Sequence, residues 1–449
     1  MVRRFHGGVH PDEGKERTAA SAIADFGIPK LVVIPLQQHI GAPAKAQVKP
    51  GDVVKKGQLI GQAGGFVSAN VHASIGGTVK KVGPWPHPLG VPVESVTIEG
   101  SGDESWAAGC NVERDVSAMS PEALRAAILE GGLVGMGGAT FPSHVKLSPP
   151  PEKPIDTLIL NGAECEPMLT ADDRVMVEEA DKVIRGAQLM LRALGCKRCL
   201  VGIENNKPDA IAAMKKATAA LPDFTVVPLR VRYPQGGEKQ LIYALLGREV
   251  PSGGLPLDVG VVVHNVGTCA AADDAVRYRR PLIERVVTVA GACAKAPGNF
   301  RVRVGTLISK LIARVGADEA MNKLIAGGPM MGLALPSSDI PVTKGTSGIL
   351  LMREVIRDAT RFPEAKAGSV PNYLACIRCG RCVDACPVSL TPSRLSTLIE
   401  KDMLKEAADW QVNDCIECGC CAYICPSRRP IVHQVKYGKA ELRRMKAKK

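Results

Sequence analysis

Apolar residues follow three different patterns along this chain of 449 residues, and each predicts a different kind of unit. Over residues 31–100, short apolar runs are separated by Pro-Gly, Lys-Gly and Gly-Gly pairs, which predicts a small all-β barrel or sandwich. Over residues 120–285, apolar strands alternate with amphipathic stretches, which predicts an α/β domain. Over residues 286–355, two strands precede one helix, an order that predicts a β-grasp unit.

Caps and periodicity predict the helices. Ser120-Pro121-Glu122 combines an N-cap, an N1 proline and a first-turn acid, so a helix is expected to begin there. Residues 172–194 predict one long amphipathic helix, and residues 392–410 predict another. The apolar residues of the last stretch share one face: Leu395, Leu398, Ile399 and Met403. The C-terminal domain is therefore expected to be mostly helical.

The all-β segment resembles the half-barrel of biotinyl and lipoyl carrier domains. Those carriers place a modifiable lysine at a hairpin tip, and the corresponding residues 67–72 contain none. A swinging-arm cofactor is therefore disfavoured, and this unit is expected to be a structural or docking module.

The expected fold class is thus multidomain, α/β plus β, with a helical cysteine-rich domain near the C-terminus. We divide the chain into the following segments: an N-terminal arm at 1–30, the lipoyl/biotinyl-like half-barrel at 31–105, the α/β domain at 118–285, a β-grasp of the soluble-ligand-binding type at 286–355, a linker at 356–370, the two-cluster domain at 371–430, and a basic tail at 431–449.

Composition supports several packed cores but few aromatic contacts. Apolar residues make up 45% of the chain and aromatic residues 4%, so the cores should consist mainly of Val, Ile, Leu and Ala. No window approaches eighteen apolar residues, so no membrane-spanning helix is expected. The start of the chain lacks the apolar region of a secretory signal, so a reducing compartment is expected.

The formal net charge is +12, and much of the excess lies in the last residues. A solvated tail is one interpretation, and a patch facing anionic lipid or an acidic partner is the other. Nucleic acid is disfavoured as a partner, because no aromatic stacking platform or groove-reading motif accompanies the charge.

Two cysteine runs, at residues 376–387 and 415–426, carry the most specific chemistry. Both have the spacing C-x2-C-x2-C-x3-C-P, in which three thiolates bind one iron–sulfur cubane and the fourth binds the other. We therefore expect two 4Fe–4S clusters. The first would use Cys376, Cys379, Cys382 and Cys425. The second would use Cys415, Cys418, Cys421 and Cys386.

Other interpretations of the cysteines fit less well. Zinc knuckles do not need the third cysteine or the Cys-Pro step, and disulfides are not expected in a chain without a secretory signal. Cys420 breaks the spacing and is the spare thiol. Cys196 and Cys199 form a separate C-x2-C pair that could be redox active, although a buried apolar pair is favoured.

A glycine-rich stretch at residues 131–146 could bind an anion through its backbone N–H groups. It follows a helix rather than a strand, which argues against a dinucleotide-binding fingerprint, and it lacks the Walker lysine spacing. Lys146 lies just beyond and could face a phosphate. A nucleotide or flavin phosphate and a plain mobile loop both remain open on this stretch alone.

Three further loops sit where strands end or helices begin, at residues 161–167, 233–239 and 264–268. Ligands of α/β sheets bind at the carboxyl ends of strands, so four such loops are expected to form a single site.

The order and residue pattern of these loops resemble the flavin-binding, NADH-oxidising subunit of respiratory complex I and of bidirectional hydrogenases. Along its full length the chain resembles the RnfC family of the Rnf (Rsx) electron-transport complexes, including an early Phe5-His-Gly-Gly-Val-His10-Pro segment. The cysteine runs and Gly137-Gly-Ala-Thr-Phe-Pro142 are the most specific shared parts.

The resemblance implies an FMN site, with NAD(H) as the second nucleotide. FMN would lie on Gly135, Gly137 and Gly138, with Lys146 near its phosphate. Asn161 and Glu164 would flank the ribityl chain and the ring, and Glu166 would lie near the nicotinamide entrance. The remaining pocket residues would be Gly236, Gly237, Glu238, Asn265 and Thr268, with Glu238 shaping the site. Hydride transfer needs no general acid or base, so none is assigned.

Three positions depart from the pattern of the complex I family. Met136 replaces an arginine, and Gly237 and Gly267 each replace a glutamate. Each change removes a charge, so the flavin potential and the nicotinamide affinity are expected to differ from those of complex I.

The implied function is a peripheral, NAD(H)-linked subunit of an ion-translocating ferredoxin oxidoreductase. Its partners would be membrane-embedded and ferredoxin-type subunits of that complex, at the cytoplasmic face of the inner membrane. The basic tail could add membrane contact. Two alternatives remain: a soluble two-cluster electron adaptor, or a docking scaffold with a vestigial flavin site.

Overall fold

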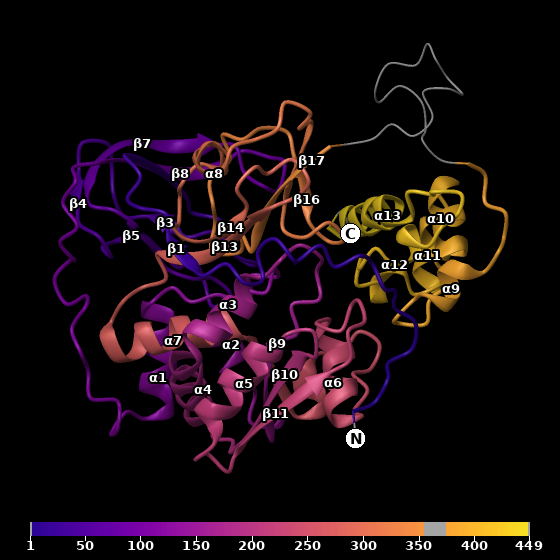
Figure 1. Ribbon diagram of the computed structural model, residues 1–449, viewed down its shortest axis with the longest axis horizontal. Coiled ribbons are helices and arrows are strands. Elements are labelled where there is room, and N and C mark those ends of the chain that lie inside the picture. The colour runs from indigo at the N-terminus through magenta and orange to yellow at the C-terminus, as the bar shows by residue number, and fades with distance from the viewer. Residues whose placement is uncertain (1, 354–373, 448–449) are drawn as a thin grey trace.

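The computed structural model describes residues 2–353 and 374–447, so the expected linker at 356–370 lies outside the described residues. The α/β unit fills the lower half of Figure 1, and two β-rich units lie above it. Helices that carry the cysteine runs form a separate group at one side. Within the described residues, no helix is both long and apolar enough to cross a membrane.

The predicted half-barrel is present as two small sheets that face each other across one apolar core. The first has the strand order β2-β8-β7-β4 and the second has the order β3-β5-β6. Inward-facing aliphatic residues such as Ile34, Ile60 and Ile98 are fully buried between them. The bounds are β2 (Leu31–Pro35), β3 (Lys45–Ala46), β4 (Val53–Val54), β5 (Leu59–Gln62), β6 (Val71–His72), β7 (Gly77–Trp85) and β8 (Val93–Gly100).

The α/β unit contains a parallel sheet of order β11-β10-β9-β12, covered by helices on both faces. Alternate residues of β9 explain this: Leu158 and Leu160 enter the larger core, while Ile159 enters the core on the other side. A strand buried on both faces must be apolar throughout, as the sequence indicated. The strands are β9 (Thr157–Gly162), β10 (Arg198–Glu204), β11 (Phe224–Leu229) and β12 (Val261–Asn265).

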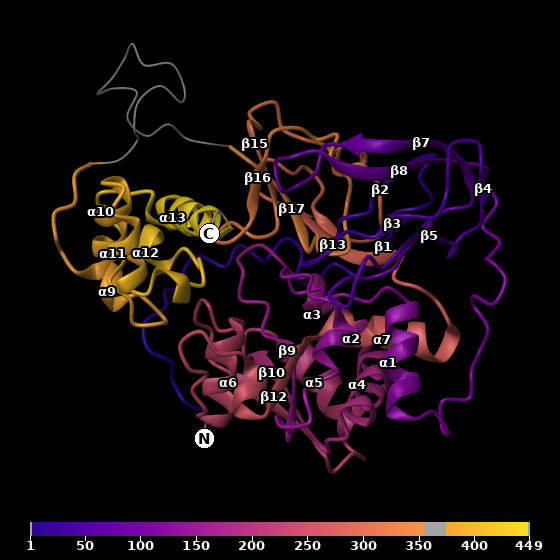
Figure 2. The same ribbon diagram turned by 180° about the vertical axis from the view of Figure 1, so that it is seen from behind.

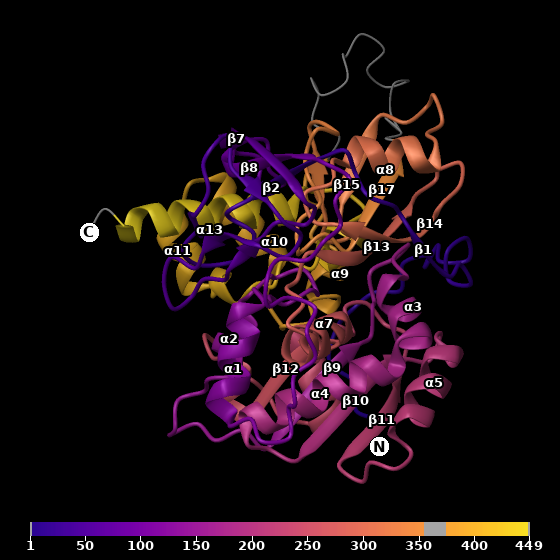
Figure 3. The same ribbon diagram turned by 90° about the vertical axis from the view of Figure 1, so that its left-hand side faces the viewer.

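The helices of this unit begin where their caps predict or close to it. Ser120 accepts a hydrogen bond from the Ala123 amide at the start of α1, which confirms the cap. Figure 3 shows α4 and α5 lying over the sheet. The helices are α1 (Pro121–Glu130), α2 (Ser143–Lys146), α3 (Ala171–Glu178), α4 (Ala180–Leu194), α5 (Pro208–Thr218), α6 (Glu238–Leu246) and α7 (Val266–Tyr278), with the 3-10 turn η1 (Pro256–Val259).

Two helices predicted as single elements are each broken in two. The stretch 172–194 divides at Glu179, which has φ −127° and ψ 28° and pairs with Lys182 and Arg301 instead of continuing the helix. The stretch 392–410 divides into α10 and α11, because Asp402 adopts a left-handed φ of 54°. Periodicity alone continued across both breaks and was wrong there.

The second β-rich unit is a mixed sheet of order β1-β14-β13-β17-β15-β16 with one helix. Its hairpin β13-β14 is antiparallel, while β13 and β17 run parallel at its centre. The edge strand β1 comes from the N-terminal arm and pairs parallel with β14. The elements are β1 (Ile23–Asp25), β13 (Glu284–Ala290), β14 (Gly298–Arg303), α8 (Ile308–Val315), β15 (Lys323–Ala326), β16 (Leu333–Leu335) and β17 (Gly348–Met352).

The cysteine-bearing unit is helical throughout residues 374–447 (Figure 2). The residues assigned to a basic tail form α13, whose Ile431, Val435 and Leu442 are buried in the same core as α10 and α11. This helix therefore belongs to the packed unit. The elements are α9 (Arg381–Asp384), α10 (Pro392–Glu400), α11 (Leu404–Asp409), η2 (Val412–Asp414), α12 (Cys420–Tyr423) and α13 (Ile431–Ala447).

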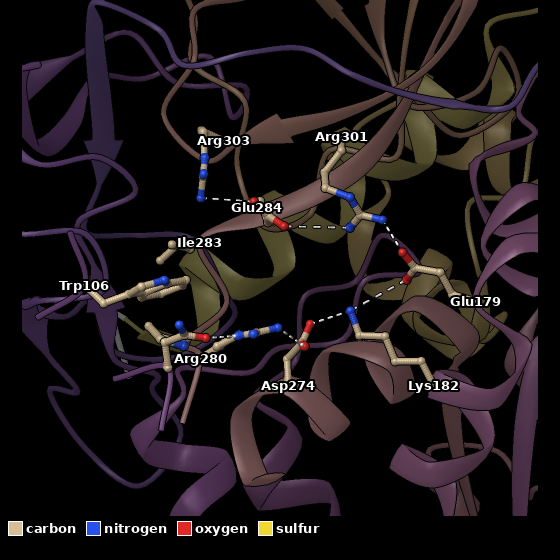
Figure 4. Close-up of a pocket in the computed structure, with 11 residues that line it drawn as sticks. Trp106, Glu179, Lys182, Asp274, Arg280, Ile283, Glu284, Arg301 and Arg303 are labelled. Atoms are coloured by element: carbon tan, nitrogen blue, oxygen red, sulfur yellow. Dashed lines mark hydrogen bonds and ion pairs between the residues drawn. The ribbon is translucent and has the colours of Figure 1, made fainter. Parts of the chain in front are cut away.

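A seam of ion pairs joins the α/β unit to the two β-rich units around a cavity of about 370 Å³ (Figure 4). Arg301 on β14 pairs with Glu179 and with Glu284. Lys182 bridges Glu179 and Asp274 within the α/β unit. The charges around this cavity are paired with one another, so the seam fixes how the units sit together.

Candidate functional site

The glycine-rich loop lies between α1 and α2 and forms a cradle without side chains. A Cβ atom added at Gly137 would lie 3.4 Å from Cβ of Asn265, so this glycine allows the loop to approach the start of α7. Gly138 has φ +108° and faces open space, where its conformation suits glycine best. The Met136 amide donates a hydrogen bond to Oγ1 of Thr268 at 2.9 Å, which fixes the loop to α7.

The start of α7 borders this cradle. Oδ1 of Asn265 accepts hydrogen bonds from the amides of Gly267 and Thr268, which caps the helix. Nδ2 of Asn265 donates to Asp172 at 2.6 Å. The positive end of a helix of 13 residues therefore points at the glycine-rich loop, an arrangement that favours an anion.

The remaining loops meet at the same edge of the sheet. Lys146 Nζ donates to Oε1 of Glu238 at 2.8 Å and to the Val263 carbonyl at 3.1 Å. Nδ2 of Asn161, at the end of β9, donates to the Gly236 carbonyl at 2.9 Å. The structure thus brings Lys146, Asn161, the 236–238 turn and the start of α7 together around the cradle.

Glu164 is engaged elsewhere. Its two carboxylate oxygens accept hydrogen bonds from the amides of Asp172 and Asp173, at 2.8 and 3.1 Å, and so cap the start of α3. Its own carbonyl accepts a hydrogen bond from the buried Lys15 of the N-terminal arm at 2.6 Å. The carboxylate of Glu164 therefore orders the wall of the site through backbone groups.

Glu166 lies at a junction of three units. Its carboxylate accepts hydrogen bonds from the amides of Met330 and Met331 in the mixed-sheet unit, at 3.0 and 2.9 Å. The Tyr233 hydroxyl lies 3.3 Å from its Oε1 atom. Burial raises the pKa of Glu166, and these hydrogen bonds oppose the rise. A place at the nicotinamide entrance stays a prediction for this residue.

Two charged residues beside the cradle were missed by the sequence analysis. Burial raises the pKa of Asp172 to about 7, the Glu164 carboxylate adds to the rise, and Arg285 opposes it. Arg285, on β13, donates hydrogen bonds to the Lys344 carbonyl at 2.6 Å and to the Met136 carbonyl at 3.4 and 3.5 Å. No local motif marks Arg285, because it reaches the loop from another unit.

The first predicted set of thiols meets at one pocket. Cys376, Cys379 and Cys382 of the first run line it together with Cys425 of the second run. Its other lining residues include Arg378 and Arg429. Cysteines distant in sequence thus face a shared cavity, as an exchange of the fourth ligand between runs requires.

The second predicted set lies deeper. Cys386, Cys418 and Cys421 are buried, and Cys415 is half-buried. Burial raises the pKa of Cys415 to about 11, and the thiols of Cys418 and Cys386 raise it further, so these groups are near neighbours. Cys420 is buried beside the Tyr233 carbonyl, at 3.9 Å from its sulfur, outside this set.

Among the described residues, no three His, Cys, Asp or Glu side chains are arranged to hold a single metal ion. A cubane has a different requirement, since each thiolate binds a separate iron. The Cys196 and Cys199 pair is buried, in agreement with the favoured interpretation of an apolar pair.

The second thiol set adjoins the flavin loops. The Tyr233 hydroxyl donates to the Cys418 carbonyl at 2.7 Å. The N-terminal arm passes between the units, where the Gly8 amide donates to the Ala385 carbonyl and Val9 forms a β-bridge with Tyr233. An added Cβ at Gly7 would lie 2.5 Å from the Cys386 carbonyl oxygen, so the arm packs directly on a predicted ligand.

Comparisons with known families divide the chain in a similar way. A model described as the Nuo51 FMN-binding domain matches residues 128–274. A model described as the RnfC barrel sandwich hybrid domain matches residues 3–103. A model described as a 4Fe-4S dicluster domain matches residues 370–426.

Curated relatives match over nearly the full chain. An RnfC-type subunit of the proton-translocating ferredoxin:NAD(+) oxidoreductase complex of Clostridium ljungdahlii is 49% identical over 446 residues, covering 99% of this chain and 95% of that protein. Its counterpart in the ion-translocating oxidoreductase complex of Rhodobacter capsulatus is 44% identical, covering 99% and 84%. The counterpart in the Na(+)-translocating ferredoxin:NAD(+) oxidoreductase complex of Acetobacterium woodii is 42% identical, covering 98% and 97%.

Among solved structures, an NAD+-reducing [NiFe]-hydrogenase in the H2-reduced state matches with a TM-score of 0.49 and 20% identity. The match covers 72% of this chain and 61% of that chain. A likeness at this level carries no argument about function.

Proposed function

Because this chain belongs to the RnfC family of ion-translocating ferredoxin:NAD(+) oxidoreductase (Rnf) complexes, we propose that it is the NAD(H)-linked subunit of such a complex. It exchanges electrons with NAD(H) at FMN and relays them singly through two 4Fe–4S clusters. One observation carries this conclusion: the glycine cradle and both cysteine sets are joined through Tyr233 within a single chain.

The flavin site is proposed at the cradle. Gly135, Gly137 and Gly138 would hold the FMN phosphate through backbone N–H groups, together with the start of α7 and the ammonium of Lys146. Bound FMN supplies the hydride chemistry with NAD(H). The protein's part is orientation: Lys146 must release Glu238 to meet a phosphate, so this ion pair sets the local charge.

Asn161 and the 236–238 turn form the other side of the proposed pocket. The hydrogen bond from Asn161 to the Gly236 carbonyl fixes the start of α6 relative to the sheet edge. Glu238 shapes the pocket through its pair with Lys146, and Thr268 holds the Met136 amide. Glu164 acts through α3, which carries Asp172 to the cradle.

The cluster ligands are proposed as two sets, each with three cysteines of one run and one of the other. Cys376, Cys379, Cys382 and Cys425 would form the outer set, which lines a pocket at the surface. Cys386, Cys415, Cys418 and Cys421 would form the inner set, which adjoins the flavin unit through Tyr233. Electrons from FMN therefore reach the inner cluster first and the outer cluster second.

The finer assignment of folds follows from topology. A hairpin, one helix and a parallel central pair of first and last strands support a β-grasp for the mixed sheet, at residues 286–355. The two-sheet barrel supports a lipoyl/biotinyl-like half-barrel at 31–105. We propose attachment to membrane-embedded and ferredoxin-type subunits at the cytoplasmic face of the membrane, as the names of the relatives suggest.

Anaerobic purification followed by iron, sulfide, FMN and absorbance measurements tests this function. Roughly eight irons and one FMN per chain are expected, with bleaching of both chromophores by NADH. In Cys379→Ser the inner cluster should still be reduced by NADH, whereas in Cys415→Ser neither cluster should be, although FMN is. A preparation with FMN absent, or with both variants behaving alike, would overturn the order or the site.

A further inference from the structure

The outer cysteine pocket lies on a surface that combines exposed apolar side chains with unpaired cations. Leu374 and Ile377, beside the first cysteine, are 57% and 67% exposed. Arg378, Arg381 and Arg428 are also exposed. Within residues 2–353 and 374–447, none of these three guanidinium groups has an ion-pair partner, in contrast to the paired arginines of the charged seam. We call these five residues the outer cluster surface.

The two parts of this surface are held together. The Leu374 amide donates a hydrogen bond to the Ser427 carbonyl at 2.9 Å, which brings the start of the first run against the end of the second. Both stretches line the pocket of the outer thiols. Asp384 is an exposed acid on the same short helix as Arg381, so the local charge is still positive.

Exposure makes this surface a suitable point of electron exchange. Cys376 and Cys379 are exposed, whereas Cys386, Cys418 and Cys421 of the inner set are buried. The arm and Tyr233 cover the inner set on the side of the flavin unit. A redox partner can therefore approach the outer set more closely than the inner one.

We propose that the outer cluster surface docks an acidic electron-transfer protein, a proposal that rests on the function given above. Apolar residues at the centre and cations at the rim have the anatomy of a transient interface, and the rim selects a partner of opposite charge. Each encounter moves one electron: the partner's redox centre loses it and the outer cubane gains it, or the reverse.

Stopped-flow mixing of a chemically reduced, acidic bacterial ferredoxin with the oxidised, fully loaded chain tests the proposal. Arg381→Glu/Arg428→Glu should lower the second-order rate constant of cluster reduction about tenfold at low salt and flatten its salt dependence. Leu374→Ser should lower the rate with little change in salt dependence. The matched control is Lys215→Glu/Lys216→Glu, two exposed cations on α5, which should change the rate less than about twofold.

The outcomes separate the docking surface from the function. Loss of iron in the double variant is detected by iron analysis, and Leu374→Ser then decides the matter alone. If NADH still bleaches FMN and both clusters but all variants accept ferredoxin electrons at the wild-type rate, the docking proposal is wrong and the function stands. If the double variant instead loses only binding to phosphatidylglycerol vesicles, the surface faces lipid and the proposal is also wrong. Failure of NADH to reduce the wild-type chain counts against the function itself.

Discussion

Arg285 provides a direct test of how the flavin cradle is held, because its guanidinium comes from a different unit. The side chain is 3% exposed. It donates to the Lys344 carbonyl at 2.6 Å and to the Met136 carbonyl at 3.4 and 3.5 Å. Burial lowers its pKa to about 10 and Asp172 opposes this, so the group is charged at neutral pH.

Arg285→Gln removes the charge and the fork of donors while keeping a polar side chain. A hydrogen bond to a charged group contributes about 1.5–3 kcal/mol. Only the Lys344 contact is short, so the variant should lose about 3 kcal/mol of contacts in total. If about half of that loss falls on the ordered state of the Met136 loop, FMN binding weakens by about tenfold.

The same substitution should change the pH dependence. Arg285 holds the pKa of Asp172 below the value that burial and Glu164 would give it. Without the guanidinium, that pKa should rise further above about 7, so Asp172 becomes neutral at neutral pH. The FMN affinity of the variant should therefore vary with pH in a range higher than that of the wild type.

Titration of the FMN-free chain with FMN, followed by flavin fluorescence at several pH values, measures both effects. Arg280→Gln is the matched control, since Arg280 pairs with Asp274 in the charged seam and should leave the affinity within about twofold. Arg285→Lys should recover part of the loss. If Arg285→Gln lowers only the unfolding midpoint and binds FMN as the wild type does, Arg285 merely joins two units and the reasoning is refuted.

Three further predictions follow from single contacts. Lys146→Ala should weaken FMN binding about tenfold, and Glu238→Gln should strengthen it by freeing the lysine, as measured by the same titration. Burial lowers the pKa of Lys344 from 10.5 to about 7, so the unfolded chain binds more protons between these values. The stability of the wild type relative to Lys344→Met should therefore rise with pH in that window, by up to about 1.4 kcal/mol per pH unit, in denaturant unfolding. Arg301→Ala should lower stability by about 1 kcal/mol and by less at high salt, because its two partners are partly exposed.

Much of the architecture could be predicted because local sequence determines it. The continuous apolar run of β9 required cover on both faces, and it received two cores. The Ser120 cap identified the start of α1. Helix breaks were missed at Glu179 and Asp402, because in both cases the apolar period continues and the break depends on backbone conformation or on a charge from another unit.

The parts of the site that the sequence did not reveal are contacts between units. Glu164 and Glu166 occupy one loop, but one caps α3 and the other binds the amides of Met330 and Met331. Neither use leaves a trace in the loop itself. Arg285 reaches the cradle from β13, and Lys15 reaches the same region from the arm.

These contacts bear on how the flavin and cluster sites are coupled. Glu166 and Cys418 share Tyr233, which lies 3.3 Å from the carboxylate and 2.7 Å from the Cys418 carbonyl through one hydroxyl. That hydroxyl has a single proton, so donation to Cys418 leaves the carboxylate with its two amide donors, or with a proton of its own. Burial raises the pKa of Glu166, which favours the second state as pH falls. The junction that fixes the distance between flavin and inner cluster is thus also the most direct route by which a proton near the nucleotide site could alter the surroundings of that cluster.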